Sequence, residues 1–377
     1  MLRIWEITGV MNAGGTESLI MEMLRHKPDD CEVELIIQSG NSNYCGVYDD
    51  EIRALGIKTY QLPSVGSVGI LAYTRKFHEL IAKVGKPNIV HIHLNAVSGF
   101  IARAAYICGI PVRIIHSHAD IHYRGNLFQK ARRELSLQIM RVFVNRYATH
   151  NFACSPRAAK RLFYNSDETL IVPNMIDVQK YLDQEENRRL ARKKYGIAEN
   201  TILVGCIGRV APIKNYEMIV EALSYINNKY HIIDIKLIIL GRCDDIPYFE
   251  KLKWLIKNKQ LEEKVIFAGN VQDIYKVIGA FDVYAMPSHS EGLGIAALEA
   301  QAAGVPTLLS RGVPEEADLK LGTVMRFSNA EELAKAILEF RPTKPKKEEI
   351  RYQFMRRGLD SCHQCQIIYD IYKSIAR

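Results

Sequence analysis

Two glutamates, Glu291 and Glu299, bracket a segment that begins as a glycine-flanked loop and continues as an Ala/Leu-rich helix. Gly292 and Gly294, on either side of Leu293, allow the backbone to approach a ligand closely. Free amides at a helix start suit phosphate oxygens, and carboxylates accept hydrogen bonds from hydroxyls. These residues predict a site for a ligand that carries hydroxyls and phosphate. The alternative is that the glutamates only stabilise a helix start, where acidic residues are common.

The flanking segments predict the elements that position this pair. Residues 281–288 form a short apolar strand that ends near Pro287, and residues 302–309 contain a helix end, a turn and the next strand. Open parallel sheets bind their ligands at the carboxyl ends of the strands. We therefore expect both glutamates at such an edge.

The run FDVYAMPSHSEGLGIAALEAQAAGVPTLLS, residues 281–310, resembles the signature of family-4 glycosyltransferases, whose nucleotide-sugar site contains two glutamates in an E-x7-E motif. The resemblance implies that Glu291 contacts the donor sugar and Glu299 the nucleotide ribose. It also implies the GT-B architecture, an α/β fold with two Rossmann-like domains of βαβ units that face each other across a cleft. Asn270 follows another predicted strand, and we expect it near the nucleotide base.

Two cations, Arg209 and Lys214, lie in the loop 208–215 between a predicted strand and a helix. Such a pair can clamp a diphosphate, although cations at strand ends are also common surface charges. The loop matches the family's G-R-x5-N pattern with its lysine, which implies that both cations bind the donor phosphates and stabilise the departing nucleoside diphosphate. The chain has no Asp-x-Asp triplet of the kind that metal-dependent sugar transferases use. We therefore expect no cofactor and no divalent metal.

The first half of the chain offers two further candidates. Gly14 and Gly15 follow the first predicted strand, where they can present amides to a phosphate or sugar, and they match the family's G-G-x-E element. They are not the Gly-x-Gly-x-x-Gly fingerprint of dinucleotide binders. His118 ends a buried strand, and the family has a functional histidine there, so we choose it over His116. His91 and His93, at another strand end, are expected to be structural or to line the acceptor site.

At 377 residues the chain exceeds what one hydrophobic core usually organises. Alternating strand and helix patterns predict an N-terminal domain over 1–173, a linker over 174–200 and a C-terminal domain over 201–350. The resemblance implies that the first is the acceptor-side domain and the second the donor-binding domain. Residues 351–377 are predicted to be helical, and the resemblance to the GT-B fold implies that this tail crosses back to the first domain. No apolar run is long enough to span a bilayer, and no signal peptide is evident. We expect a cytoplasmic protein, either free or attached peripherally to the inner face of the plasma membrane.

The formal net charge of +8 is concentrated between residues 124 and 161, which include nine basic residues and one acidic residue. Such a patch attracts phosphates on an anionic membrane or on a pyrophosphate-linked lipid. Apolar residues recur at helical spacing among the basic ones, which fits either a helix on a membrane surface or a helix packed inward with a solvated basic face. Nucleic acid is not an expected partner, because base-stacking motifs are not interleaved with the patch.

The resemblance to family-4 glycosyltransferases implies a retaining hexosyltransferase, and the missing Asp-x-Asp triplet predicts that it needs no metal. It would move a sugar from a nucleotide-diphosphate donor, by default a UDP-hexose or UDP-N-acetylhexosamine, to an acceptor hydroxyl. The expected acceptor is a lipid-linked saccharide in surface-polysaccharide biosynthesis. His118, Glu291, Arg209 and Lys214 are the expected catalytic residues. A UDP-sugar 2-epimerase of the same fold and a catalytically silent sugar-nucleotide-binding partner remain as alternatives.

Overall fold

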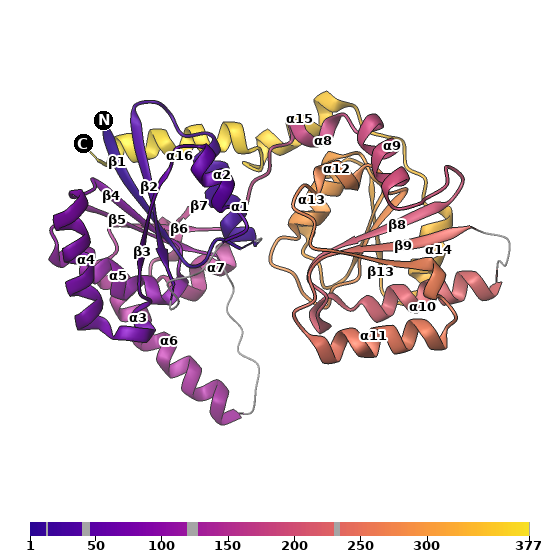
Figure 1. Ribbon diagram of the computed structural model, residues 1–377, viewed down its shortest axis with the longest axis horizontal. Helices are drawn as coiled ribbons and strands as arrows, with labels where there is room; N and C mark the ends of the chain where they lie inside the picture. The colour runs from indigo at the N-terminus through magenta and orange to yellow at the C-terminus, as the bar shows by residue number, and fades with distance from the viewer. Residues whose placement is uncertain (13, 40–45, 119–126, 230–233, 377) are drawn as a thin grey trace. The chain divides into compact units, whose positions relative to one another are not determined.

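The computed structural model describes residues 1–377 except 13, 40–45, 119–126, 230–233 and 377. The chain divides into two compact units, unit 1 with Met1–Ile176 and Ser361–Arg377, and unit 2 with Asp177–Asp360 (Figure 1). Each unit is built on one parallel sheet with helices on both faces, which confirms the predicted α/β class.

The sheet of unit 1 has seven strands in the order β3-β2-β1-β4-β5-β6-β7. All neighbouring pairs are parallel, and the two central strands, β1 and β4, pair from Ile4 with Ile89 to Ile7 with Ile92. The strands are β1 (Leu2–Thr8), β2 (Cys31–Gln38), β3 (Lys58–Leu62), β4 (Ile89–Ile92), β5 (Val112–Ser117), β6 (His150–Ala153) and β7 (Leu170–Ile171).

Apolar side chains on alternate positions of these strands build two cores, one on each face of the sheet. Ile4 points into the core beneath α1, α2 and α16, and Trp5 points into the core beneath α3 to α7. The helices are α1 (Gly15–Arg25), α2 (Asp49–Ala54), α3 (Val65–Val68), α4 (Ile70–Val84), α5 (Ser98–Ile107), α6 (Leu127–Tyr147), α7 (Pro156–Leu162) and α16 (Ser361–Ile375), with short 3-10 turns at Asn95–Val97 and Ser166–Glu168.

The C-terminal helix α16 completes unit 1. The hydroxyl of Tyr369 donates to the carbonyl of Met23 in α1 at 2.8 Å, and the amide of Ser361 donates to the carbonyl of Ile176 at 2.9 Å. We placed the start of this crossing segment at residue 351, whereas the structure assigns α15 (Lys347–Arg356) to unit 2 and places the crossing at Ser361. The two helices are separated by a short break at Gly358, which the sequence reading did not treat as a boundary.

The sheet of unit 2 has six parallel strands in the order β10-β9-β8-β11-β12-β13. They are β8 (Ile202–Ile207), β9 (Ile235–Leu240), β10 (Val265–Gly269), β11 (Val283–Met286), β12 (Thr307–Ser310) and β13 (Val324–Phe327). The helices are α8 (Gln179–Leu182), α9 (Glu185–Lys194), α10 (Tyr216–Lys229), α11 (Ile246–Asn258), α12 (Tyr275–Ile278), α13 (Ile295–Ala302), α14 (Ala330–Glu339) and α15, with 3-10 turns at Pro212–Lys214, Glu262–Lys264 and Glu315–Ala317.

The segment 174–200, which we treated as a linker, contains α8 and α9 and is part of unit 2 from Asp177 onward. Its anchor is Arg192, whose side chain is buried and lies 3.1 Å from the carboxylate of Asp282. The same guanidinium donates to the carbonyls of Ala198 and Thr201, each at 2.6 Å. Within the segment that we predicted to be a linker, an arginine thus satisfies carbonyl groups inside the fold.

Among the residues that the structure describes, no helix combines the length and the apolar character needed to cross a membrane.

Candidate active site

The structure brings together Lys214 and Glu291, which are 77 residues apart in the sequence. Strands β8 and β11 are neighbours in the sheet of unit 2, so the loops that follow them meet at one edge. Lys214 Nζ lies 2.7 Å from Glu291 Oε1, and both side chains are largely buried, with 17% and 15% exposure. The site therefore holds one cation and one carboxylate in direct contact.

Asn215 connects the loop after β8 to the loop after β11. It adopts a left-handed backbone conformation with φ of 53°, and its side-chain amide donates to the carbonyl of Pro287 at 3.2 Å. Gly208 lies beneath the Lys214 side chain, because a Cβ at that glycine would lie 2.8 Å from Lys214 Cε. Both residues belong to the G-R-x5-N pattern, but the pattern alone did not predict that they hold Lys214 in position.

Arg209 stands apart from this pair. Its side chain is 59% exposed, and its contact with Asp244 is loose at 3.7 Å. The structure therefore does not place Arg209 in the same contact as Lys214 and Glu291. An exposed guanidinium of this kind retains its donors for an incoming anion.

Glu299 lies on α13 and contacts Tyr181, which the sequence patterns did not predict as a site residue. The hydroxyl of Tyr181 in α8 donates to Glu299 Oε1 at 2.7 Å. Burial raises the pKa of Glu299 to about 7, and the hydrogen bond from Tyr181 opposes this rise. The Tyr181–Glu299 contact joins α8, in the segment we treated as a linker, to the candidate site, and no local motif signals it.

The remaining predicted residues lie at the expected loops. Gly294 precedes α13 in the left-handed conformation, with φ of 81°, while Gly292 is exposed and Leu293 is partly buried. Asn270 is exposed directly after β10, at the outer edge of the sheet.

In unit 1, Gly14 precedes α1 and Gly15 is its first residue. A Cβ at Gly14 would meet only the flexible carboxylate of Glu17, so packing alone does not require glycine there. The sheet order places the carboxyl ends of β1, β4 and β5 side by side, with α1 beginning shortly after β1.

Four histidines gather at the ends of β4 and β5 in unit 1. His93 Nε2 lies 2.7 Å from Glu6 Oε2, and His93 Nδ1 lies 2.8 Å from His118 Nε2. His91 Nδ1 lies 2.5 Å from the hydroxyl of Tyr372, which donates to the other Glu6 oxygen at 3.1 Å. Sequence reasoning selected His118 but missed Glu6 and Tyr372, which lie far from it in the chain.

The ionisation of this cluster follows from its burial. Burial lowers the pKa of His93 to about 4 and holds the pKa values of His116 and His118 well below their usual range. Burial would raise the pKa of Glu6, but the adjacent His91 and His93 rings bring it down to about 2. At neutral pH Glu6 is therefore a carboxylate, and His93, His116 and His118 are neutral imidazoles.

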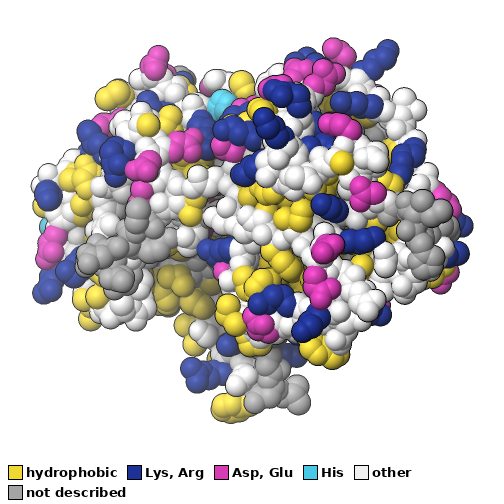
Figure 2. Space-filling model, turned by 45° about the vertical axis from the view of Figure 1, so that its right-hand side comes forward, with side chains coloured by type: hydrophobic (Ala, Val, Ile, Leu, Met, Phe, Trp, Pro, Cys, Tyr) yellow, Lys and Arg dark blue, Asp and Glu magenta, His cyan; other side chains and the backbone are white. Residues whose placement is uncertain are grey.

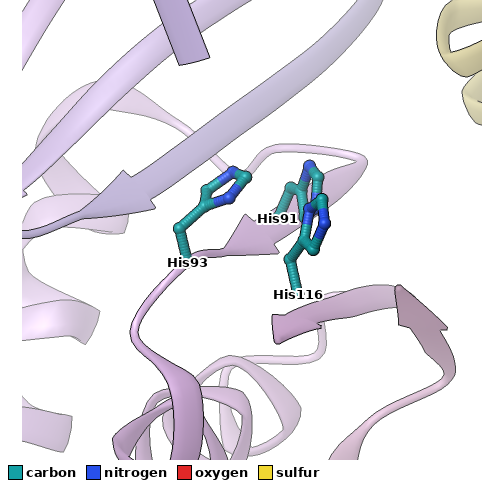
Figure 3. A group of neighbouring side chains, drawn as sticks. All are labelled: His91, His93 and His116. Atoms are coloured by element: carbon teal, nitrogen blue, oxygen red, sulfur yellow. The ribbon is translucent and has the colours of Figure 1, made fainter. Parts of the chain in front are cut away.

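Figure 3 shows His91, His93 and His116, whose ligating nitrogens lie within 4.8 Å of one another. The rings of His91 and His116 are stacked, with 7° between their planes and 5.2 Å between their centroids. Because imidazole lone pairs lie in the ring plane, two stacked rings direct them along parallel planes and not toward one point. This geometry favours stacking over a shared metal ion.

Two family models match the chain. Residues 14–174 match the "Glycosyl transferase 4-like domain", and residues 187–354 match "Glycosyl transferases group 1". The first match covers the histidine cluster at the ends of β4 and β5, and the second covers Lys214, Glu291 and Glu299.

Two curated relatives extend this agreement. EpsF of Bacillus subtilis (strain 168), itself only provisionally assigned as a glycosyltransferase, is 29% identical over 98% of this chain and 96% of its own length. An Escherichia coli enzyme named "UDP-Gal:alpha-D-GlcNAc-diphosphoundecaprenol alpha-1,3-galactosyltransferase" is 26% identical over 70% of this chain and 67% of its own length.

Among solved structures, Anabaena Alr3699/HepE in complex with UDP and glucose covers 99% of this chain and 100% of its own, with a TM-score of 0.79 and 18% identity. At that identity the likeness shows a shared fold. The fold, both matched domains and the curated relatives agree, and the chain belongs to the family-4 glycosyltransferases with the GT-B fold.

Proposed function

We propose that this glycosyltransferase moves a hexose or N-acetylhexosamine from a UDP-sugar to an acceptor hydroxyl, with retention of anomeric configuration and without a divalent metal. The observation that carries the proposal is the Lys214–Glu291 contact beside the start of α13. The Lys214 ammonium can bind phosphate, the Glu291 carboxylate can bind sugar hydroxyls, and the two groups are directly hydrogen-bonded to each other.

Each residue then has a distinct task. Lys214 and the exposed Arg209 bind the donor diphosphate and stabilise the negative charge that grows on it as the sugar departs. Glu291 binds the donor sugar, and Glu299 binds the ribose. In a retaining transfer the acceptor attacks from the face that the diphosphate leaves, and a departing phosphate oxygen takes the acceptor proton. His118 binds a hydroxyl of the sugar.

The names of the relatives support this choice of donor. The Escherichia coli relative is named for UDP-galactose, and the Anabaena protein was solved with UDP and glucose. Both names refer to uracil nucleotides and hexoses. We therefore choose UDP-hexoses as the first donors to test.

A thermal-shift screen of the full chain tests the donor site. Nucleoside diphosphates are compared at equal concentration with EDTA present, and we expect UDP to raise the melting temperature more than ADP or GDP. At a concentration of 100 times its dissociation constant, a ligand stabilises its site by about 2.7 kcal/mol. No shift with any nucleotide in EDTA, followed by a shift on adding Mg²⁺, contradicts metal independence.

The proposed acceptor is a lipid-linked saccharide, because α6 of unit 1 presents both apolar and basic side chains to solvent. Its buried side holds Leu137 and Val144, which lie in the core. The opposite side exposes Phe128, Leu135, Ile139 and Val142 at 79%, 64%, 53% and 55%. Their spacing of seven, four and three residues places these four on one face of the helix. Figure 2 shows hydrophobic and basic side chains together on the projecting end of α6.

The basic patch is only partly available to a partner. Arg161 pairs with Glu134 at 2.5 Å, and Arg141 donates to the carbonyl of Phe163 at 3.2 Å. Arg124 lies outside the described residues. The patch members whose side chains are exposed are Lys130, Arg132, Arg133, Arg146, Arg157 and Lys160. With the apolar face, they form a surface suited to an anionic lipid layer.

Vesicle binding tests this surface with a matched pair of variants. Leu135→Asp places a charge on the exposed face of α6, whereas Leu71→Asp makes the same change at a residue that is 79% exposed on α4. We expect the first to weaken binding to phosphatidylglycerol vesicles at least tenfold and the second to leave it unchanged. Equal binding by both variants, or binding that ignores salt, favours a soluble acceptor.

The two alternatives give different products. A 2-epimerase would release UDP and an epimerised free sugar without an acceptor, and a silent binding partner would release nothing. Both curated relatives described above carry glycosyltransferase names, and no finding favours either alternative.

A further inference from the structure

Three hydrogen-bonded side chains form a chain from the interior of unit 1 to His118. Glu6 Oε2 lies 2.7 Å from His93 Nε2, and His93 Nδ1 lies 2.8 Å from His118 Nε2. Both distances are those of direct hydrogen bonds. Each contact therefore holds one proton between its two atoms.

The charge of Glu6 sets the direction of both bonds. Although burial acts to raise it, the adjacent His91 and His93 rings hold the pKa of Glu6 at about 2, so the carboxylate is ionised at neutral pH. An ionised carboxylate only accepts hydrogen bonds, so His93 Nε2 carries a proton and donates it. Burial holds the pKa of His93 near 4, and a neutral imidazole carries only one proton. His93 Nδ1 is therefore bare, and it accepts from His118 Nε2–H.

We propose that Glu6 and His93 are positioning residues that fix His118 in the tautomer protonated at Nε2, leaving Nδ1 to accept a hydrogen bond from a substrate hydroxyl. This proposal rests on the role of His118 at the donor sugar given under the proposed function. His118 Nδ1 has no hydrogen-bond partner among the described residues. The sequence alone does not show whether His118 donates or accepts a hydrogen bond toward the substrate. The contacts with His93 and Glu6 indicate that its Nδ1 accepts one.

The groups that surround Glu6, His93 and His118 leave the assigned tautomers unchanged at neutral pH. His116 stacks on His118 with 4.0 Å between ring centroids, and burial keeps it neutral by lowering its pKa. Burial raises the pKa of Tyr372 well above its usual range, so its hydroxyl stays protonated and donates to Glu6 Oε1. His91 meets the oxygen of Tyr372, and it lies 3.3 Å from Glu6 Oε2.

Two substitutions at His93 separate a positioning role from simple packing. The amide of His93→Gln can donate to Glu6 and accept from His118, whereas the ring of His93→Phe can do neither. We expect His93→Phe to lower kcat about 10- to 100-fold, as loss of an orienting partner typically does. We expect His93→Gln to recover most of that loss. A packing role predicts the reverse order, because the site is buried and phenylalanine is apolar.

Tyr73→Phe is the control, since Tyr73 is as buried in unit 1 as His93 and its hydroxyl contacts Gln38 and none of the histidines. Its kcat should stay within about threefold of the original. The pH profile adds a second readout, because the positive charge on a protonated His93 is one cause of the lowered pKa of His118. In His93→Phe the acid limb of the rate profile should therefore move to higher pH.

Nitrogen-15 NMR of the full chain with labelled histidine tests the tautomers without any turnover. We expect His93 and His118 to be protonated at Nε2 at pH 7.5, with Nδ1 bare in both. A His118 ring protonated at Nδ1 overturns the proposal, even if the enzyme transfers sugar as proposed. Conversely, the expected tautomers in a chain that turns over no nucleotide sugar would support the positioning chain and refute the proposed function.

Discussion

Lys214 and Glu291 in unit 2 place opposite charges 2.7 Å apart in loops that solvent partly reaches. In unit 1, Glu6 is wholly buried, and its hydrogen-bond partner His93 is an imidazole that burial keeps neutral. The first arrangement can exchange its partners for those of a charged ligand, because each group already interacts with an opposite charge. The second fixes the directions of its hydrogen bonds. The carboxylate can only accept, so the neutral ring beside it uses its single proton to donate to it, and its other nitrogen must accept.

The largest expected effect is at the contact between Lys214 and Glu291 in unit 2. Lys214→Ala removes the cation that is proposed to stabilise the departing diphosphate, and we expect kcat/KM to fall by about 10²- to 10³-fold. Steady-state kinetics with the donor identified by the thermal-shift screen measures this effect. Lys251→Ala is the matched control, since that lysine is 68% exposed in the same unit and also pairs with a glutamate. Equal activity of both variants would show that Lys214 is only a structural partner of Glu291.

The second expected effect is that unit 1 loses stability in acid. The pKa of His93 is lowered in the folded state to about 4 from 6.5, so the unfolded chain binds more protons between these values. Unit 1 should therefore lose stability as pH falls from about 6.5 to about 4, by about 1 to 3 kcal/mol.

Fluorescence can follow this loss in unit 1 alone. The chain has two tryptophans, Trp5 buried in unit 1 and Trp254 exposed in unit 2, so Trp254→Phe leaves a single reporter. Urea unfolding of this variant at pH 7 and pH 5 gives the difference. A midpoint that does not fall at pH 5 contradicts the neutral histidine cluster.

The smallest effect is a shift of pH dependence at Glu299. Its pKa of about 7 means that a fraction of the empty site is protonated at neutral pH, and the proposed ribose contact requires an acceptor. UDP binding should therefore weaken as pH falls below about 7. The Tyr181 hydroxyl lowers this pKa, so in Tyr181→Phe the midpoint should move upward by up to about one pH unit.

Calorimetric titration with UDP from pH 6 to pH 8.5 measures this midpoint. Tyr275→Phe is a close control, because the Tyr275 ring lies 6.3 Å from that of Tyr181. If both variants bind UDP with the original pH dependence, the Tyr181–Glu299 contact does not tune the site.

The two regions also differ in how far their sequences predict them. Glu291, Glu299 and Lys214 lie in loops with glycines and a recognisable spacing, and alternating apolar patterns indicated the sheets around them. Glu6 lies inside an apolar strand, 87 residues from His93, and nothing in its immediate sequence marks it as a partner. Such contacts depend on strand order, which places β1 beside β4, and on α16 covering the sheet.

The same limit explains the errors at the boundaries. We predicted a linker over 174–200, yet Arg192 is buried there and satisfies backbone carbonyls and Asp282. The role of Tyr181 was missed for a related reason, since its partner lies 118 residues away in the chain.

The most direct test of the proposed transfer is proton NMR of slow donor hydrolysis by the full chain in EDTA, with water as the acceptor. With a UDP-α-hexose that binds in the thermal-shift screen, we expect the first free sugar to carry the small anomeric coupling of the α anomer, before mutarotation equilibrates it. A β anomer formed first would contradict retention, and a sugar epimerised at its second carbon would identify a 2-epimerase.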